Sequence, residues 1–374
     1  MKFNIWKCRI PVAPCKETIP PSESTTSSSE QLQTTRLAVA CRDDSQPDME
    51  YESTITIGKL IGSGSFSCVY HVDLCDSPER ETCIVHPSGL HHRSGEGCLA
   101  IKRLREVFPD ERTERLASSD LIKEAKVLSS LPRHENIVSL RGLSLGFWDE
   151  STIVRPGRFL LLDQVDETLG TCLERLRKLI YAQPCGNRFS LKHRRDAICE
   201  TQRHRIQVYA LGVAKALQFL HQQGYVYRDL KPWNIGLLYN SHNACPVIKL
   251  FDFGLTRPCT EWTSGIPGSE ASGTARYMAP EVIEESEHGL ACDVHSFALV
   301  LWQICSLKRP YSNAITSKFL HQLISVDKTR PPLDRVKSLI IQDLLCACWN
   351  PNPSLRPNFD AITTILNDYA REVQ

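Results

Sequence analysis

Three side chains suited to phosphoryl chemistry lie close together in the second half of the chain. Asp229, Lys231 and Asn234 bring a carboxylate, an ammonium and a carboxamide within six positions. A carboxylate can accept a hydroxyl proton, a lysine can neutralise a transferring phosphoryl group, and an asparagine oxygen can ligate a hard cation. The segment follows a predicted amphipathic helix, residues 205–224, that ends at Gly224. These side chains are therefore expected on a loop.

A further acid stands at the end of a strand-like segment. Asp252 follows residues 249–251 and precedes Phe253 and Gly254. Carboxylate and amide oxygens are the ligands that Mg²⁺ prefers in proteins. Asp252 and Asn234 are therefore predicted to supply the ligands of a magnesium site.

A glycine-containing turn follows the first strand-like segment of the chain. Gly62 and Gly64 lie two positions apart, and Ser67 stands where a third glycine is usual in nucleotide-binding loops. Glycines let a backbone approach phosphates closely, so that free N–H groups can bind the anion. Taken alone, such a pair of glycines could equally be an ordinary turn.

Lys102 closes a short apolar strand, residues 99–102, and needs a partner because desolvating its charge is costly. Glu124 lies on the next predicted helix, residues 121–131, whose apolar residues share one face. An ion pair between the two would direct the ammonium toward phosphate oxygens. Taken singly, the two residues could be unrelated surface charges.

The composition is that of an ordinary soluble protein. The 374 residues include 44 Lys plus Arg and 43 Asp plus Glu, a net charge of +1. This balance argues against a protein whose main task is to bind nucleic acid. The longest apolar stretches, such as residues 297–302, are too short to cross a bilayer. We therefore expect no nucleic-acid partner and no membrane span.

Cysteine usage points to a reducing compartment. The chain has 16 cysteines but no C-x-x-C pair, and no apolar signal segment near its first residue. We therefore expect reduced thiols and a location in the cytoplasm or the nucleus. The opening residues are basic and lack acids until Glu17, which is also compatible with an organelle transit peptide.

Residues 1–50 are predicted to form a disordered tail. Ser, Thr and Pro fill 12 of the 18 positions from 18 to 35, which leaves too little apolar surface to offset the entropy of ordering. The tail is either a solvated leader or a phosphorylated regulatory segment. Residues 51–374 are predicted to form the folded domain, strand-rich at first and helical later, which indicates two lobes with a cleft between them.

Two polar insertions interrupt the predicted domain, at residues 73–97 and 183–204. The first carries Cys and His side chains that could bind zinc, but their spacing fits no compact pattern, so a surface loop is favoured. The second is rich in Arg, His and Lys and is either a solvated insertion or a docking patch.

Taken together, the motifs resemble those of the eukaryotic protein kinases over residues 54–370. The matching segments, in the family's order, are the glycine turn at 61–70, Lys102, Glu124, Tyr227-Arg228-Asp229, Asp252-Phe253-Gly254, Ala279-Pro280-Glu281, Asp293 and Arg356. The resemblance implies a bilobal α+β fold. Its small β-rich N-lobe would span about 51–163 and its larger α-helical C-lobe about 167–374, with an ATP cleft between them.

The sequences of several segments resemble those of the tyrosine-kinase-like branch, which includes RAF-type and mixed-lineage-type enzymes. Residues 134–138, 273–281 and 293–302 carry this similarity. Lys231 two positions after the catalytic-loop aspartate, with Thr274 before Ala279-Pro280-Glu281, is the arrangement of serine/threonine kinases. The resemblance therefore implies transfer of the γ-phosphoryl group of ATP to Ser and Thr hydroxyls of protein substrates in signal transduction. The alternatives are a pseudokinase scaffold and a dual-specificity or tyrosine kinase.

The resemblance also implies a role for each site residue, with ATP and Mg²⁺ as cofactors. Asp229 would orient and deprotonate the attacking hydroxyl, and Lys231 would steady the γ-phosphoryl group. Lys102, held by Glu124, would bind the α- and β-phosphates. The residues expected to contact nucleotide are Ile61, Gly62, Ser63, Gly64, Ser65, Phe66, Val69, Ala100, Lys102, Leu162, Asp163, Val165, Asn234 and Asp252.

The adenine end of the site is placed by similarity to the family's linker between lobes. Leu162 would be the gatekeeper, and Asp163 and Val165 would offer backbone groups to adenine. Gly236 stands where the family usually has an apolar residue beneath adenine, and Leu237 beside it is expected to compensate.

Two other departures concern Ser67, in place of a third glycine, and Tyr227, in place of a histidine beneath the catalytic loop. Neither removes a group that would contact phosphate or metal.

The segment between Asp252 and Glu281 is polar and hydroxyl-rich. Its phosphorylation by an upstream kinase or by the chain itself would give Arg228 a partner and order the segment; the candidate positions are Thr260, Thr263, Ser264 and Ser269.

Overall fold

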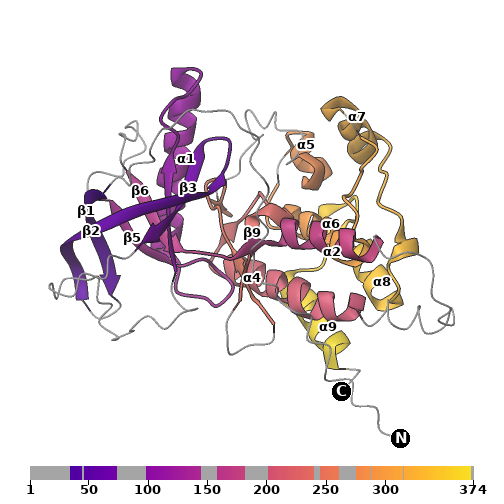
Figure 1. Cartoon of the computed structure of the whole chain (residues 1–374). Coiled ribbons are helices and arrows are strands. Elements are labelled where there is room, and N and C mark those ends of the chain that lie inside the picture. Colours follow the sequence, from indigo (N-terminus) through magenta and orange to yellow (C-terminus); the bar gives the residue numbers. More distant parts are fainter. Residues whose placement is uncertain are drawn as a thin grey trace, which may run out of the picture.

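The chain folds into two lobes (Figure 1), one rich in strands and one helical. The computed structural model describes residues 34–43, 46–73, 98–144, 158–181, 201–239, 245–260, 275–286, 288–314 and 316–371. Strands gather in the first part of the described chain and helices in the remainder, with the exception of one long helix in the small lobe. The predicted two-lobed α+β architecture is confirmed.

One antiparallel sheet forms the small lobe. Its described strands are β1 (Thr34–Asp43), β2 (Gln46–Ser63), β3 (Ser67–Asp73), β4 (Leu99–Leu104), β5 (Leu140–Ser144) and β6 (Phe159–Asp163). They run in the order β1-β2-β3-β4-β6-β5, and β1 also pairs with β5, so the sheet closes on itself. Side chains alternate between the two faces of a strand. Ile101 therefore packs with Phe159 and Leu161 on one face, whereas Leu160 and Leu162 join the main core on the other.

Helix α1 (Glu111–Ser130) packs against β4 and β5. Asp110 caps its first turn, because its side chain accepts a hydrogen bond from the backbone N–H of Thr113 at 2.8 Å. Leu121, Ala125 and Leu128 lie on its buried face, as their spacing predicted. The helix begins ten residues earlier than residue 121 because the N-cap at Asp110 starts it.

The large lobe is built around helix α6 (Ala291–Ser306), in which every residue from Cys292 onward is buried. A helix that is apolar on all sides belongs in a core. The other helices of this lobe are α2 (Leu169–Tyr181), α4 (Leu211–Gln222), α5 (Pro280–Ile283), α7 (Ser317–His321), α8 (Leu339–Cys348) and α9 (Phe359–Arg371). Of these, α4, α8 and α9 contact α6. Helices α4 and α9 pack against each other in the lower part of the lobe in Figure 1.

Short strands connect the lobes and carry the candidate site. Strands β7 (Glu167–Thr168), β9 (Ile235–Leu238) and β10 (Val247–Leu250) form a small sheet in the order β10-β9-β7. Strands β8 (Tyr225–Val226) and β11 (Arg257–Pro258) form a second one. The loops that leave β8 and β10 contain Asp229 and Asp252 respectively.

The predicted tail differs from the structure over part of its length. Residues 34–43 and 46–50 are paired strands rather than disordered chain, because the small apolar run at residues 37–41 suits a strand. Residues 1–33 lie outside the described part, as do 74–97 and 182–200 of the two insertions. Residues 201–204, which were assigned to the second insertion, are already helical.

Within the described ranges, no helix combines the length and the apolar character that crossing a bilayer requires.

A buried ion pair joins two motifs that are far apart in the sequence. Arg356 donates to both carboxylate oxygens of Glu281, at 2.5 and 2.9 Å, and also to the carbonyl oxygens of Ala291 and Asn350. Arg356 and Glu281 are 8% exposed each. Arg356 therefore joins two elements to the segment that precedes α9: helix α5, through Glu281, and the start of α6, through Ala291.

Replacing Arg356 should strongly destabilise the large lobe. In Arg356→Met the carboxylate of Glu281 would stay buried without its partner, which typically costs about 3–5 kcal/mol of unfolding free energy. Arg371→Met is a suitable control, because Arg371 is exposed and only 3.7 Å from Asp368, a type of pair worth about 0–1 kcal/mol. Urea denaturation of the three proteins measures the difference, and an Arg356→Met variant as stable as the control would contradict this account.

Candidate active site

The ammonium of Lys102 is the centre of the candidate site. Its Nζ donates to Oε2 of Glu124 in α1 at 2.5 Å and to Oδ1 of Asp252, after β10, at 2.8 Å. The predicted pair between Lys102 and Glu124 is therefore confirmed, and Asp252 extends it across the two lobes. The side chains of Lys102 and Glu124 are 12% and 1% exposed, whereas that of Asp252 is 41% exposed. A ligand can therefore reach the Asp252 carboxylate.

Mutual attraction favours the charged forms of Lys102 and Asp252, whereas burial raises the pKa of the Glu124 carboxyl. Burial alone would lower the pKa of Lys102, but the adjacent carboxylates of Asp252 and Glu124 raise it. Burial likewise opposes ionisation of Asp252, yet the ammonium of Lys102 outweighs it and lowers the pKa of that carboxyl. The site therefore presents a fixed ammonium beside an accessible carboxylate.

The predicted catalytic loop is a compact hydrogen-bonded unit. Lys231 donates to Oδ2 of Asp229 at 2.6 Å, and the amide nitrogen of Asn234, in the turn η2 (Pro232–Asn234), donates to the same oxygen at 2.8 Å. The other carboxylate oxygen, Oδ1, is buried and has no hydrogen-bond partner among the described residues. Burial raises the pKa of Asp229 to about 6, against the opposing effect of Lys231. This oxygen is thus an acceptor without a donor.

Asp293 at the start of α6 holds this loop in place. Its fully buried carboxylate accepts from the backbone N–H of Tyr227 at 2.7 Å and of Arg228 at 2.8 Å, and His221 Nε2 lies 2.9 Å away. Arg228 has a φ of 73°, a strained left-handed conformation for a non-glycine residue. The two hydrogen bonds on either side of this bend stabilise it and aim Asp229.

Tyr227 fills the position that the family gives to histidine. Its ring packs edge to face against Phe253, with centroids 5.5 Å apart, and its hydroxyl donates to the carbonyl oxygen of Phe251 at 2.5 Å. The backbone N–H of Phe253 donates in turn to Glu124 at 3.3 Å. The tyrosine therefore links the catalytic loop to Asp252-Phe253-Gly254 by packing and by a hydrogen bond.

Strand pairing brings Asn234 and Asp252 to the same end of two neighbouring strands. Ile235 of β9 is opposite Leu250 of β10, so the residues next to this pair, Asn234 and Phe251, are neighbours; the backbone N–H of Phe251 donates to the carbonyl oxygen of Asn234 at 3.1 Å. Asp252 follows directly. Since the Asn234 amide nitrogen is bound to Asp229, its Oδ1 remains as an acceptor. Hard oxygen donors thus converge from both strands, which fits a Mg²⁺ site.

The predicted glycine turn connects β2 and β3. The backbone N–H of Gly64 donates to the carbonyl oxygen of Ser67 at 2.8 Å, so a serine in place of the third glycine completes the turn through its backbone. Gly62 is paired with Val69, and Val69 with Lys102, so the start of the turn is level with Lys102 across the sheet. Ile61, Ser63 and Ser65 are exposed and Phe66 is half-buried.

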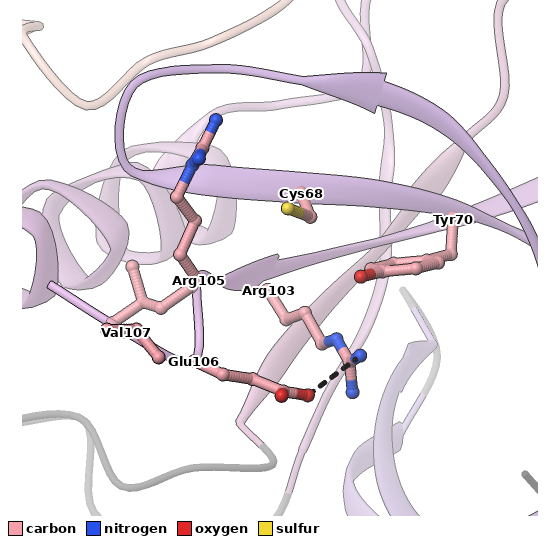
Figure 2. A pocket seen from close by; sticks show the side chains of 7 residues that line it. Cys68, Tyr70, Arg103, Arg105, Glu106 and Val107 are labelled. Carbon is pink, nitrogen blue, oxygen red and sulfur yellow. Dashed lines mark hydrogen bonds and ion pairs between the residues drawn. The ribbon is translucent and has the colours of Figure 1, made fainter.

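Arg105 was not predicted as a site residue, yet it binds this turn. Its guanidinium donates to the carbonyl oxygen of Gly64 at 2.7 and 3.0 Å and to Oγ of Ser63 at 2.9 Å. Figure 2 shows Arg105 pointing to the turn and Arg103 pointing away from it, toward Glu106. No sequence motif marks Arg105, because an arginine after a strand is ordinarily a solvated surface charge.

The structure describes the residues that were predicted at the adenine end of the site. Ala100 is paired with Leu162 across β4 and β6, and both are buried. A Cβ atom at position 236 would lie 2.5 Å from Cγ1 of Val165, so Val165 occupies the space of the missing side chain. Leu237 is fully buried in the main core; the expected compensation therefore comes from Val165.

Several predicted features lie outside the described residues. These are Thr263, Ser264, Ser269 and Thr274, and the Cys and His side chains of the first insertion. Thr260 is described and exposed. Among the residues that the structure describes, no cluster of three or more His, Cys, Asp or Glu side chains is suited to a metal.

Comparison with known proteins gives a consistent result. A family model for protein tyrosine and serine/threonine kinases matches residues 55–366. Serine/threonine-protein kinase STY17 of Arabidopsis thaliana is 36% identical over 190 residues, 50% of this chain and 31% of that protein. Serine/threonine/tyrosine-protein kinase HT1 of the same plant is 34% identical over 160 residues, 43% of this chain and 39% of that protein.

A more distant relative covers more of the chain. Mitogen-activated protein kinase kinase kinase 7 of Drosophila melanogaster is 27% identical over 285 residues, 75% of this chain and 36% of that protein. In each of these three relatives the matched region is about a third of the protein's length.

Removing the guanidinium of Arg105 should loosen the glycine turn. Arg105→Ala deletes three hydrogen bonds to the turn, and hydrogen exchange at Gly64 and its neighbours should become roughly 10-fold faster, since about 1.4 kcal/mol of local stability corresponds to that factor. Arg103→Ala removes an equal charge that does not contact the turn. Exchange at residues 62–67, followed by mass spectrometry, should differ between the two variants; equal rates would refute the tether.

Proposed function

Because the chain belongs to the family of protein tyrosine and serine/threonine kinases, we propose that it transfers the γ-phosphoryl group of ATP to Ser and Thr hydroxyls of protein substrates. The observation that carries this proposal is the contact of Lys102 with both Glu124 and Asp252. It joins the two lobes and leaves the Asp252 carboxylate accessible. The match covers only about a third of each relative's length. The activity of the whole protein is therefore part of the proposal.

The nucleotide would lie between the glycine turn and Lys102. The ammonium of Lys102, held by two carboxylates, would attract the α- and β-phosphates, and the turn at Gly62 and Gly64 would cover them. Leu162 and Val165 would bound the adenine pocket, with Asp163 and Val165 supplying backbone groups. The packing of Val165 on Gly236 supports an apolar lower wall at this end of the pocket.

The protein kinase family uses ATP with a divalent metal, and the donors found here suit Mg²⁺. Asp252 and the Oδ1 atom of Asn234 would hold it, since both lie at the same end of the β9–β10 pair. When bound, the cation would neutralise phosphate charge. The residues' own part is to fix its position beside Lys102.

Asp229 would orient the attacking hydroxyl and accept its proton. Its Oδ1 is buried and lacks a donor among the described residues, which supports this role, since a substrate hydroxyl is the donor that the atom lacks. Lys231, 2.6 Å from the other oxygen, would steady the γ-phosphoryl group. Catalysis would then depend on positioning and electrostatics rather than on covalent chemistry of the protein.

Serine/threonine specificity is supported by Lys231 and by the names of the matched relatives. One relative, HT1, carries tyrosine in its name as well, so dual specificity is the second candidate. Phosphoamino-acid analysis of a labelled generic substrate separates the two. All groups required for phosphoryl transfer are present, and nothing favours a pseudokinase.

Regulation by phosphorylation is part of the proposal. Arg228 precedes Asp229, burial lowers the pKa of its guanidinium, and its Nε has no hydrogen-bond partner within the described ranges. A phosphate on the segment after Asp252, added by an upstream kinase or by the chain itself, would supply a partner.

The proposed location is the cytoplasm or the nucleus, in keeping with the free thiols of the described cysteines.

Two substitutions test the assignment of roles. Lys102→Met should remove phosphate positioning and Asp229→Asn the proton acceptor, and each should lower kcat by roughly 10²-fold or more. Arg103→Ala, in the same strand as Lys102 but paired with Glu106, is the matched control and should retain activity. Turnover is followed with radiolabelled ATP and a protein substrate. Wild-type rates in both site variants would show that the roles are assigned wrongly.

A further inference from the structure

A cavity of about 630 Å³ in the large lobe is lined mainly by cationic side chains. Its walls are Glu174, Arg177 and Lys178 of α2, Lys308 after α6, and Arg335. Four cations thus face one acid, in a chain whose net charge is only +1. The positive excess is therefore a local property of this cavity.

Three of the four cations have no partner among the described residues, and Arg335 is not one of these three. In the described part of the chain, the side chains of Arg177, Lys178 and Lys308 form neither ion pairs nor hydrogen bonds. Glu174 lies one turn before Arg177 and Lys178 on the same helix, where it can offset one charge at most. Three segments bring like charges together here, which costs energy unless an anion compensates them.

Hydrogen bonds connect two of the segments that line the cavity. Gln202, which is buried, donates to the carbonyl oxygens of Cys305 and Arg335 at 2.9 and 2.8 Å and accepts from the backbone N–H of Lys337 at 2.8 Å. Arg205 donates to Cys305 as well, at 3.1 Å. The segments that carry Lys308 and Arg335 are therefore fixed relative to each other, so the charges are preorganised for a ligand.

The cavity lies beside the catalytic loop. Trp233 stands between Lys231 and Asn234, and its ring packs so closely on α2 that a Cβ at Gly170 would lie 2.9 Å from it. The guanidinium of Arg309 lies over the same ring, 5.7 Å from its centroid. Arg309 follows Lys308 directly, so Trp233 contacts both the helix and the segment that supply the cavity's lining residues.

The distance along α2 sets the reach of a bound peptide. At 1.5 Å per residue, Glu174 and Lys178 lie roughly 6 and 12 Å along the helix from Gly170. An extended peptide spans about 3.3 Å per residue. An extended peptide would therefore cover the length of α2 from Gly170, which contacts Trp233 of the catalytic loop, to Lys178 with about four residues.

We propose that this cavity binds acidic side chains of the protein substrate, a few residues from the hydroxyl that is phosphorylated. The proposal rests on the proposed function and adds a substrate class to it. Arginine forks suit carboxylate and phosphate oxygens alike, so the shared ligand chemistry is an anionic side chain. A substrate already phosphorylated nearby is the second source of such a group.

Peptide binding tests the proposal without requiring catalysis. Fluorescent peptides carry a central alanine in place of the target residue and four glutamates before it, four after it, or glutamines at the same positions; a further set carries phosphoserine. Anisotropy is measured with the full chain and with Arg177→Glu, Lys308→Glu and Lys215→Glu. Lys215, exposed on α4, is the control for an equal charge change away from the cavity.

One of the two glutamate peptides should bind the full chain at least about 10-fold more tightly than its glutamine counterpart. Each cavity variant should lower this preference by about threefold to tenfold, and Lys215→Glu should leave it unchanged. Preference for phosphoserine over glutamate would identify the phosphate as the natural anion. Equal binding of all peptides would overturn the proposal, and so would an equal loss in Lys215→Glu.

Serine versions of the same peptides separate the two proposals. If acidic peptides bind selectively but no phosphate is transferred to any of them, the proposed function fails and the cavity's assignment stands. If all serine peptides are phosphorylated with the same kcat/KM and bind equally, the activity stands and the cavity's assignment fails.

Discussion

The contact of Lys102 with two carboxylates is the interaction on which the rest of the site depends. A lysine in the interior of a sheet must be compensated, because burial of an unpaired charge costs far more than a hydrogen bond returns. Glu124 supplies one partner from α1, and Asp252 supplies the other from the end of β10. Since these elements belong to different lobes, the charge of one side chain determines how the lobes approach each other.

A second constraint acts on the other side of the site. Asp293 is fully buried, and it is compensated by two backbone N–H groups of the catalytic loop and by His221. The loop is strained at Arg228, so it needs these bonds to keep Asp229 in place. Tyr227 then joins both constraints, because it packs on Phe253, whose N–H binds Glu124. The predicted catalytic loop, the proposed metal ligands and helix α1 thus form one connected unit.

The sequence predicted those parts of the site whose chemistry is local. Asp229, Lys231 and Asn234 lie in one short segment, whereas Lys102 and Glu124 were paired only through the resemblance to protein kinases. The rest depended on tertiary contacts. Arg105 reaches the turn from a neighbouring strand, and the partner of Gly236 is Val165, which lies some seventy positions earlier in the chain. The strand at residues 34–43 is stabilised by pairing with β2 and β5, and composition alone could not reveal that partner.

The central claim is that Lys102, Asn234 and Asp252 together form a site for a nucleotide with its metal. Thermal unfolding with ATP tests it most directly, with either Mg²⁺ or a chelator present, in the wild type and in Asp252→Asn. At about 100 times Kd, a ligand that binds only the folded state adds about 2.7 kcal/mol of stability. The account predicts such a shift for the wild type with Mg²⁺ and a much smaller one with chelator or in Asp252→Asn. Equal stabilisation by ATP in all of these conditions would contradict it.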